Sequence, residues 1–273
     1  MSVLVWSITA AVLAWSGLLY LRHSRRSKLF LQPLPPDWIR ILERNVPLYL
    51  LLPQNLREEL HGRINILLDE KEFIGCAGLK ITDEMRLTIA GNASLLLLQR
   101  GKPCFPGFTS ILVYPDTYVA QEINYDGLIE TSEQSIRAGE SWHRGPVVLS
   151  WADIMRDTMD HGAGHNVVIH EFAHKLDEEN AIMDGLPVLS GSTDYGEWAQ
   201  VLTREYESLQ NSIEHDAVSV LDDYGATSPA EFFAVATETF FEKPLQMKKI
   251  LPELYQQLKR FYKLDPASWR NTH

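Results

Sequence analysis

The chain has 273 residues, of which 45% are hydrophobic and 22% are charged, and its formal net charge is -11. These proportions exclude a wholly disordered chain, and the acidic balance argues against a nucleic-acid binder, which needs a basic face. The two cysteines, Cys76 and Cys104, are too few for a disulfide framework. We therefore expect a globular protein that binds no nucleic acid.

The amino terminus contains a long uncharged run. Val3 to Leu21 is mostly apolar and reaches the length of about 20 residues that a helix needs to cross a bilayer. The basic residues Arg22, Arg25 and Arg26 follow it. By the positive-inside rule, residues 1–28 are predicted to be a single-pass anchor in the inner (cytoplasmic) membrane, with the rest of the chain facing the cytoplasm. The alternative is a buried or interfacial amphipathic helix.

Helical spacing dominates the next part of the chain. Closely spaced prolines predict a linker over residues 29–36, followed by one domain over residues 37–273. Apolar residues recur at helical spacing over residues 54–69 and about 83–99. The amino-terminal part of the domain, about residues 37–100, is therefore expected to be helical.

Short strands are predicted in the middle of the chain. Residues 111–114 and 118–120 flank a Pro-Asp turn, whereas residues 127–144 are polar and predict a loop. Residues 146–151 begin with a proline, which favours an edge strand. Its backbone could hold an extended substrate, or the strand could simply pair within the small sheet. Helices follow again, so we predict an α+β fold with a small mixed sheet and a catalytic part over about residues 101–273.

The residues with the clearest chemistry are His170-Glu171-Phe172-Ala173-His174. Both imidazoles project from one face of a helix, at the spacing that lets one Zn²⁺ take a nitrogen from each. Glu171 can accept a proton from a metal-activated water, which is the mechanism of metal-assisted amide hydrolysis. Their neighbours are apolar, and a buried histidine or glutamate is costly unless it is paired or metal-bound. The pattern predicts one zinc ion per chain rather than a surface histidine pair.

A catalytic zinc site uses three protein ligands, and we expect the third from residues 224–238. Ser228, Pro229 and Glu231 form a capping-box pattern, so the carboxylate of Glu231 either caps its own helix or binds the metal. Glu238 lies two turns later on the same face. It could replace Glu231 as a ligand or hold a ligating histidine through a hydrogen bond. Spacing leaves this choice open.

Other polar residues carry weaker predictions. Asp177 lies on the ligand face, where its carboxylate would accept an imidazole N–H, unless it only ends the helix in a solvated acidic run. His161 and His165 are expected to be polar residues of a loop. Cys104 lacks the sequence context of a nucleophilic thiol.

The segments HEFAHKLD and YGATSPAEFFAVATETFF resemble the Mlc titration factor A family of zinc peptidases. The resemblance covers most of Pro33 to Pro266, and the tyrosine seven residues before the helix-borne glutamate is also similar to the catalytic domain of anthrax lethal factor. It implies a zincin-like fold and peptide hydrolysis that is chiefly aminopeptidase-like. It further implies Glu231 as the third zinc ligand, Tyr224 as the stabiliser of the oxyanion, and a repressor protein as a partner.

Two functions are therefore predicted. The favoured one is a membrane-anchored zinc metallopeptidase that acts on a peptide or protein substrate. The alternative is a regulatory binding protein that sequesters a transcriptional repressor of sugar uptake, with a secondary zinc site. Glu171 favours the enzyme, because a structural zinc site needs no general base.

Overall fold

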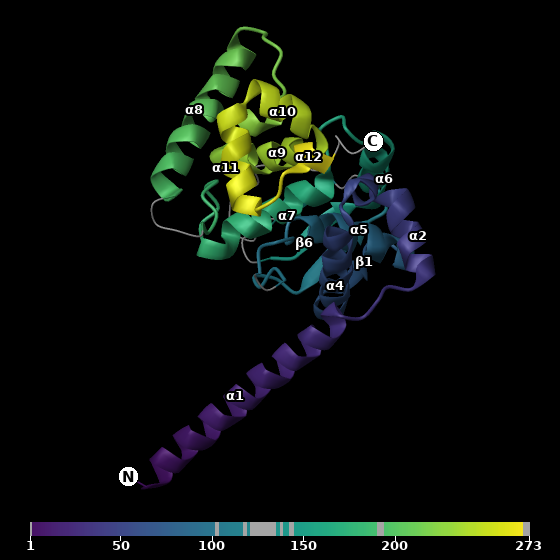
Figure 1. Cartoon of the computed structure of the whole chain (residues 1–273), viewed down its shortest axis with the longest axis vertical. Coiled ribbons are helices and arrows are strands. Elements are labelled where there is room, and N and C mark those ends of the chain that lie inside the picture. The colour runs from purple at the N-terminus through teal and green to yellow at the C-terminus, as the bar shows by residue number, and fades with distance from the viewer. Residues whose placement is uncertain are drawn as a thin grey trace, which may run out of the picture.

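The computed structural model describes residues 2–101, 104–116, 119–120, 135–136, 139–141, 145–189 and 194–269. Figure 1 shows that the long amino-terminal helix α1 projects away from the rest of the described chain, in which the carboxyl-terminal helices lie on one side and the sheet with the earlier helices on the other. The helix α7 runs between these two parts. It therefore contacts both.

The helix α1 (Ser2–Phe30) is 29 residues long, and its carboxyl-terminal end packs against α4 (Gln54–Glu70). Two ion pairs join these helices, Arg25 with Asp69 and Arg26 with Glu70, each with a shortest N–O distance of 2.5 Å. The basic residues that follow the apolar run thus belong to the same helix and contact the body of the protein.

The predicted membrane anchor over residues 1–28 is wrong. In the part of the chain that the structure describes, no helix is long and apolar enough to cross a membrane. The last turns of α1 are basic, and Arg25 and Arg26 pair there with acidic residues of α4. The predicted location in the inner membrane depended on this helix and is corrected with it.

The amino-terminal helices follow the apolar spacing closely. They are α2 (Pro36–Asn45), α3 (Pro47–Leu51), α4, which is one residue longer than predicted, and α5 (Asp83–Leu95). The side chain of Thr82 accepts the N–H of Met85 and begins α5. This helix ends four residues before the predicted position, because residues 96–99 form turns that keep their leucines buried.

The main sheet has the strand order β1-β2-β6-β5. Its strands are β1 (Glu72–Gly75), β2 (Ser110–Tyr114), β6 (Val147–Ser150) and β5 (Gly139–Ser141). The first three are parallel, and β5 pairs with β6 in the antiparallel sense. A separate pair contains β3 (Val119–Ala120) and β4 (Ser135–Ile136).

One strand prediction is corrected by this topology. The predicted edge strand is β6, which lies inside the sheet between β2 and β5, so its backbone pairs with both neighbours instead of being open to a substrate. β2 pairs with β1 and β6 rather than with the strand that follows it, because parallel pairing joins segments far apart in the chain. Most of the predicted loop 127–144 lies outside the described residues.

The carboxyl-terminal part is helical. Its elements are α6 (Trp151–Met159), α7 (Val167–Asp177), η1 (Glu178–Asn180), α8 (Asp194–Glu214), η2 (Asp223–Ala226), α9 (Pro229–Glu242), α10 (Pro244–Ile250), α11 (Pro252–Tyr262) and α12 (Pro266–Trp269). Phe172 anchors α7 to the sheet side, with its ring centroid 4.9 Å from that of Phe105. The opposite side of α7 packs against α9.

The expected fold was an α+β, zincin-like domain preceded by a transmembrane helix. The described chain is instead mostly helical, with a small sheet whose centre is three parallel strands, and it contains no membrane-spanning helix. The helical apolar spacing extends over most of the sequence, whereas the strands are only two to five residues long. For this reason helices outweigh the sheet.

Candidate metal centre

The helix α7 carries the two histidines into the interior. Asn166 is its N-cap, and its Oδ1 accepts the N–H of Ile169 at 3.1 Å. Apolar residues of α7 enter the core, while His170 and His174 face α9. The apolar and polar positions of one helix therefore place both imidazoles at a buried helix–helix contact.

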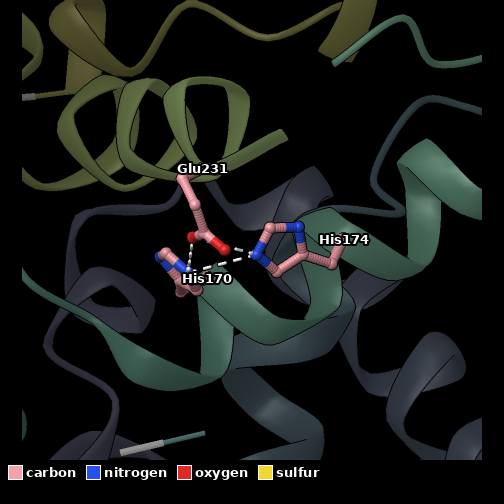
Figure 2. Close-up of side chains that lie close together, drawn as sticks. All are labelled: His170, His174 and Glu231. Carbon is pink, nitrogen blue, oxygen red and sulfur yellow. Dashed lines mark hydrogen bonds and ion pairs between the residues drawn. The ribbon is translucent and has the colours of Figure 1, made fainter. Parts of the chain in front are cut away.

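The helix α9 provides the carboxylate that meets them. Ser228 accepts the N–H of Glu231 at 3.2 Å, and Pro229 occupies the first turn, as the capping pattern predicts. The carboxylate of Glu231 points to the two histidines, as Figure 2 shows. Of the two roles left open for it, contact with the histidines is the one that the structure contains.

The three side chains converge closely (Figure 2). Glu231 Oε2 lies 2.9 Å from His170 Nε2 and 3.3 Å from His174 Nε2, and the two imidazole nitrogens are 3.2 Å apart. The ligand atoms of a tetrahedral zinc ion, with bonds of about 2.0–2.1 Å, lie about 3.3–3.4 Å from one another. The cluster therefore has both the donor types and nearly the spacing that a zinc ion requires.

Glu238 lies behind the cluster. Its Oε1 is 2.7 Å from His170 Nδ1, and its Oε2 accepts the N–H of Asn166 at 2.6 Å. A carboxylate at Nδ1 favours a proton on that nitrogen, so that Nε2 would be the nitrogen that binds a metal ion. Glu238 is thus placed to orient a histidine ligand.

The electrostatics of the cluster favour positive charge among its members. Burial lowers the pKa of His170, but the carboxylates of Glu238 and Glu231 outweigh it and hold this pKa well above its ordinary value. Burial raises the pKa of Glu231, yet hydrogen bonds with His170 and His174 hold it well below its ordinary value. A divalent cation satisfies this preference as a proton does, so metal and protons would compete for the site.

Glu171 lies beside the histidines and is only 3% exposed. Burial raises its pKa, opposed by the charges of His170 and His174. Among the described residues, its Oε2 has no hydrogen-bond partner. A buried carboxylate oxygen without a partner is costly, which is consistent with a group that exchanges protons with a bound water or substrate.

Tyr224 lies on η2, at the open side of the cluster. Its ring centroid is 6.0 Å from that of His170, and the residue is 52% exposed. It lines a cavity of about 420 Å³ together with Glu171 and Asp222. Asp222 accepts the N–H of Tyr224 at 2.9 Å, and its other oxygen is 3.4 Å from His165 Nε2. His165 is therefore part of the cavity wall as well as of a loop.

Asp177 is the last residue of α7, as one of its two predicted roles requires, but the acidic run there is not solvated at this position. It is buried rather than solvated, and it accepts the N–H of Gly185 at 2.7 Å, whereas His174 Nδ1 has no hydrogen-bond partner among the described residues. Burial also raises the pKa of Cys104 to about 12. Its thiol therefore stays protonated, in line with the absence of a nucleophilic role.

Sequence reasoning missed the polar residues that support the cluster. Asn166 immediately precedes an apolar helix and could have been recognised as its N-cap. Glu242 follows Glu238 by four residues and shares its helix face. The contact between Asp222 and His165 has no sequence signal, because it joins two loops.

Comparison with known proteins identifies the family. The model of the glucose-regulated metallo-peptidase M90 family matches residues 21–263. An uncharacterized protein of Synechocystis is 43% identical over 244 residues, which cover 89% of each chain. Mlc titration factor A of Yersinia pestis and that of Yersinia pseudotuberculosis are each 35% identical over 236 residues, or 84% of this chain and 86% of theirs.

These matches confirm the resemblance to the Mlc titration factor A family, whereas the similarity to anthrax lethal factor stays a prediction. The family match covers α7 and α9, which carry the candidate metal cluster. The chain therefore belongs to the glucose-regulated metallo-peptidase family M90.

Proposed function

We propose that this protein is a zinc metallopeptidase that hydrolyses peptide bonds in an aminopeptidase-like manner. The observation that carries the proposal is the convergence of His170, His174 and Glu231, whose ligand atoms all lie within 4.8 Å of one another. The family name, metallo-peptidase, supports a bound metal. Zinc is favoured because two imidazoles and a carboxylate are the ligands of known catalytic zinc sites.

In this proposal His170, His174 and Glu231 hold one zinc ion. The ion would supply Lewis-acid polarisation of the scissile carbonyl and a pKa of about 7 for the attacking water. Glu238 keeps His170 oriented through the contact at 2.7 Å with Nδ1. The remaining steps belong to side chains that line the cavity.

Glu171 acts as the general base. Its buried carboxylate takes the proton from the attacking water and then delivers it to the leaving amine. Burial raises the pKa of Glu171 above its ordinary value, which makes its carboxylate a better proton acceptor. Tyr224, which lines the same cavity, donates a hydrogen bond from its hydroxyl to the oxyanion of the reacting carbonyl.

One experiment tests this proposal directly. The full chain is purified, its metal content is measured, and its cleavage of aminoacyl p-nitroanilides and short peptides is compared with that of Glu171→Gln. We expect about one zinc per chain in both proteins and a loss of turnover of about 10²- to 10⁴-fold in the variant. A chain that takes up no zinc, or a variant with full activity, would contradict the proposal.

A regulatory binding role is the second candidate. It is favoured by the name of two relatives, Mlc titration factor A, which describes titration of Mlc. In that role the protein would sequester a repressor through its surface, and zinc would be secondary. The two candidates differ in the effect of Glu171→Gln, which should abolish peptide cleavage but leave repressor binding unchanged in a pull-down with purified Mlc.

A further inference from the structure

The helix α9 presents three carboxylates along one face. Glu238 lies seven residues after Glu231, and Glu242 lies four residues after Glu238. Counted from Glu231, these are about two and three helical turns, so all three carboxylates lie on the same side of α9. The first belongs to the candidate metal cluster and the second contacts His170. The third, Glu242, is not one of the proposed metal ligands.

Glu242 reaches the same asparagine that caps α7. Its Oε1 accepts a hydrogen bond from Asn166 Nδ2 at 3.1 Å, and Asn92 Oδ1 on α5 lies 3.1 Å from the same nitrogen. The backbone N–H of Asn166 donates to Glu238 at 2.6 Å, and its Oδ1 caps α7. Every polar group of the Asn166 side chain therefore has a hydrogen-bond partner.

The second oxygen of Glu242 holds the loop that leads into α7. Its Oε2 accepts the N–H of Gly162 at 3.0 Å. Gly162 has a φ of +83°, a left-handed conformation that favours glycine. Glu242 thus connects α9 both to the approach loop and to the first turn of α7, four residues before His170.

Burying these polar groups is energetically unfavourable if they only stabilise the fold. Glu242, Glu238 and Asn166 are all buried, and taking carboxylates out of water costs several kcal/mol per ion, so apolar residues would stabilise such a contact equally well. Unlike apolar packing, directional hydrogen bonds fix the position of the first turn of α7 relative to α9. The ligand atoms of the cluster span those same two helices.

We propose that Glu242 and Asn166 are a positioning pair for the metal centre. They hold Glu238 against His170 and set the distance between α7 and α9, so that the three ligand atoms meet at the spacing a metal requires. This inference rests on the proposed zinc site. Loss of hydrogen-bonding partners behind metal ligands typically lowers metal affinity by about 10- to 100-fold, and we expect about tenfold here because Glu242 acts through Asn166.

The test measures zinc affinity of the full chain by competition with a chromogenic chelator. Glu242→Gln keeps the shape but cannot accept both hydrogen bonds, and Asn166→Ser keeps an N-cap of similar strength while losing the donors to Glu242 and Asn92. Each variant should raise the zinc Kd about tenfold. The double variant should cost little more than either single one, since both remove the same link.

A second measurement separates positioning from stability. Tyr262→Phe removes a hydrogen bond of 3.0 Å to Thr237 on α9, which involves none of the residues of the cluster or the positioning pair. It should lower the Tm and leave the zinc Kd unchanged. Co²⁺-loaded Glu242→Gln and Asn166→Ser should show an altered visible absorption spectrum, whereas Co²⁺-loaded Tyr262→Phe should match the wild type.

The outcomes distinguish the two proposals. If the wild-type chain binds no zinc, the proposed function fails. If it binds zinc and both variants bind within twofold of it, only the positioning proposal is wrong. Failure of both variants to fold, judged by circular dichroism, would overturn the positioning proposal too, because the network would then serve the fold as a whole.

Discussion

The helix pairs α1–α4 and α7–α9 are both joined by opposite charges, but the charges differ in how deeply they are buried. Between α1 and α4, Arg25 meets Asp69 at the surface with 69% of its side chain exposed. Between α7 and α9, His170 meets Glu231 and Glu238, and all three side chains are at least three-quarters buried. Exposed pairs contribute about 0–1 kcal/mol, whereas a buried charge without its partner costs about 3–5 kcal/mol.

The difference in burial explains why the contact between α7 and α9, rather than that between α1 and α4, can form a functional site. The pairs between α1 and α4 hold two helices together in water, and salt screens them. The charges between α7 and α9 cannot be relieved by water, so they depend on protons or a cation. A site of this kind is sensitive to metal, to pH and to single substitutions, and the predictions below test that difference from the largest effect to the smallest.

The largest effect is expected from Glu231→Ala in the buried pair. It removes one of three proposed ligands and leaves two imidazoles facing each other, so the zinc affinity should fall by more than about 100-fold, beyond the effect of groups behind the ligands. Chelator competition measures this change. An alanine substitution in the surface pair, Asp69→Ala, is the control and should leave the zinc Kd unchanged. Equal zinc affinity in both variants would remove Glu231 from the site.

Tyr224→Phe tests the open side of the same site. Removing the hydroxyl should lower turnover by about 100-fold, since one oxyanion donor contributes about 2.7–4 kcal/mol. Zinc content should stay at the wild-type level, because the phenol is not a proposed ligand. Steady-state kinetics with metal analysis on the same sample checks both. Normal turnover would exclude the tyrosine from the mechanism.

Asp177→Asn tests the cost of a buried charge on α7. Burial raises the pKa of Asp177 from 3.8 to about 6, so the folded state binds this proton more tightly than the unfolded state. The stabilisation is complete below about pH 3.8 and is lost as the pH rises through about 6. A pKa difference of about 2 corresponds to about 3 kcal/mol, so the variant should be about 2–3 kcal/mol more stable than wild type at pH 7.5.

Urea unfolding of metal-free wild type and Asp177→Asn between pH 4 and 8 measures this effect. The difference between the two proteins should shrink toward zero as the pH falls to about 4, because the wild-type carboxyl is then protonated. A constant difference across this range would show that the substitution acts through packing or through the hydrogen bond to Gly185 rather than through charge.

The smallest effect is expected from Arg26→Ala between α1 and α4. Arg26 makes two hydrogen bonds with Glu70, at 2.5 and 2.7 Å, but the pair is only partly buried. Its loss should lower the free energy of unfolding by about 1 kcal/mol or less, and less still in 1 M salt. Zinc binding should not change. A loss above 2 kcal/mol would show that α1 is a more integral part of the fold than its contacts indicate.

Much of α7 and α9 could be predicted from the sequence because their signals are local. The spacing of His170 and His174 depends only on 3.6 residues per turn, and Ser228 with Pro229 predicts the start of α9 within the same few residues. Spacing did not choose between Glu231 and Glu238, since both lie on one face. The structure separates them by depth, with Glu231 on Nε2 of His170 and Glu238 on Nδ1.

The wrong predictions concern interactions between distant segments or with the surroundings. β1 was missed because four residues carry little pattern of their own, and it forms by pairing with β2 about 38 residues later. The interior place of β6 depends on β5, which the polar composition of residues 127–144 did not indicate. The apolar run of α1 had the length of a membrane span, but the sequence did not show that the basic end of this helix pairs with α4.

By itself, the sequence determined two helices, one with two histidines and a glutamate and one with a cap and two inward carboxylates. Only the tertiary structure decided that they meet, with the atoms of Glu231 and His170 2.9 Å apart across 61 residues of chain. It also decided that Asn166 and Glu242 support that contact. The physical reason is that hydrogen bonds within a turn follow from backbone geometry, whereas contacts between helices depend on how the whole core packs.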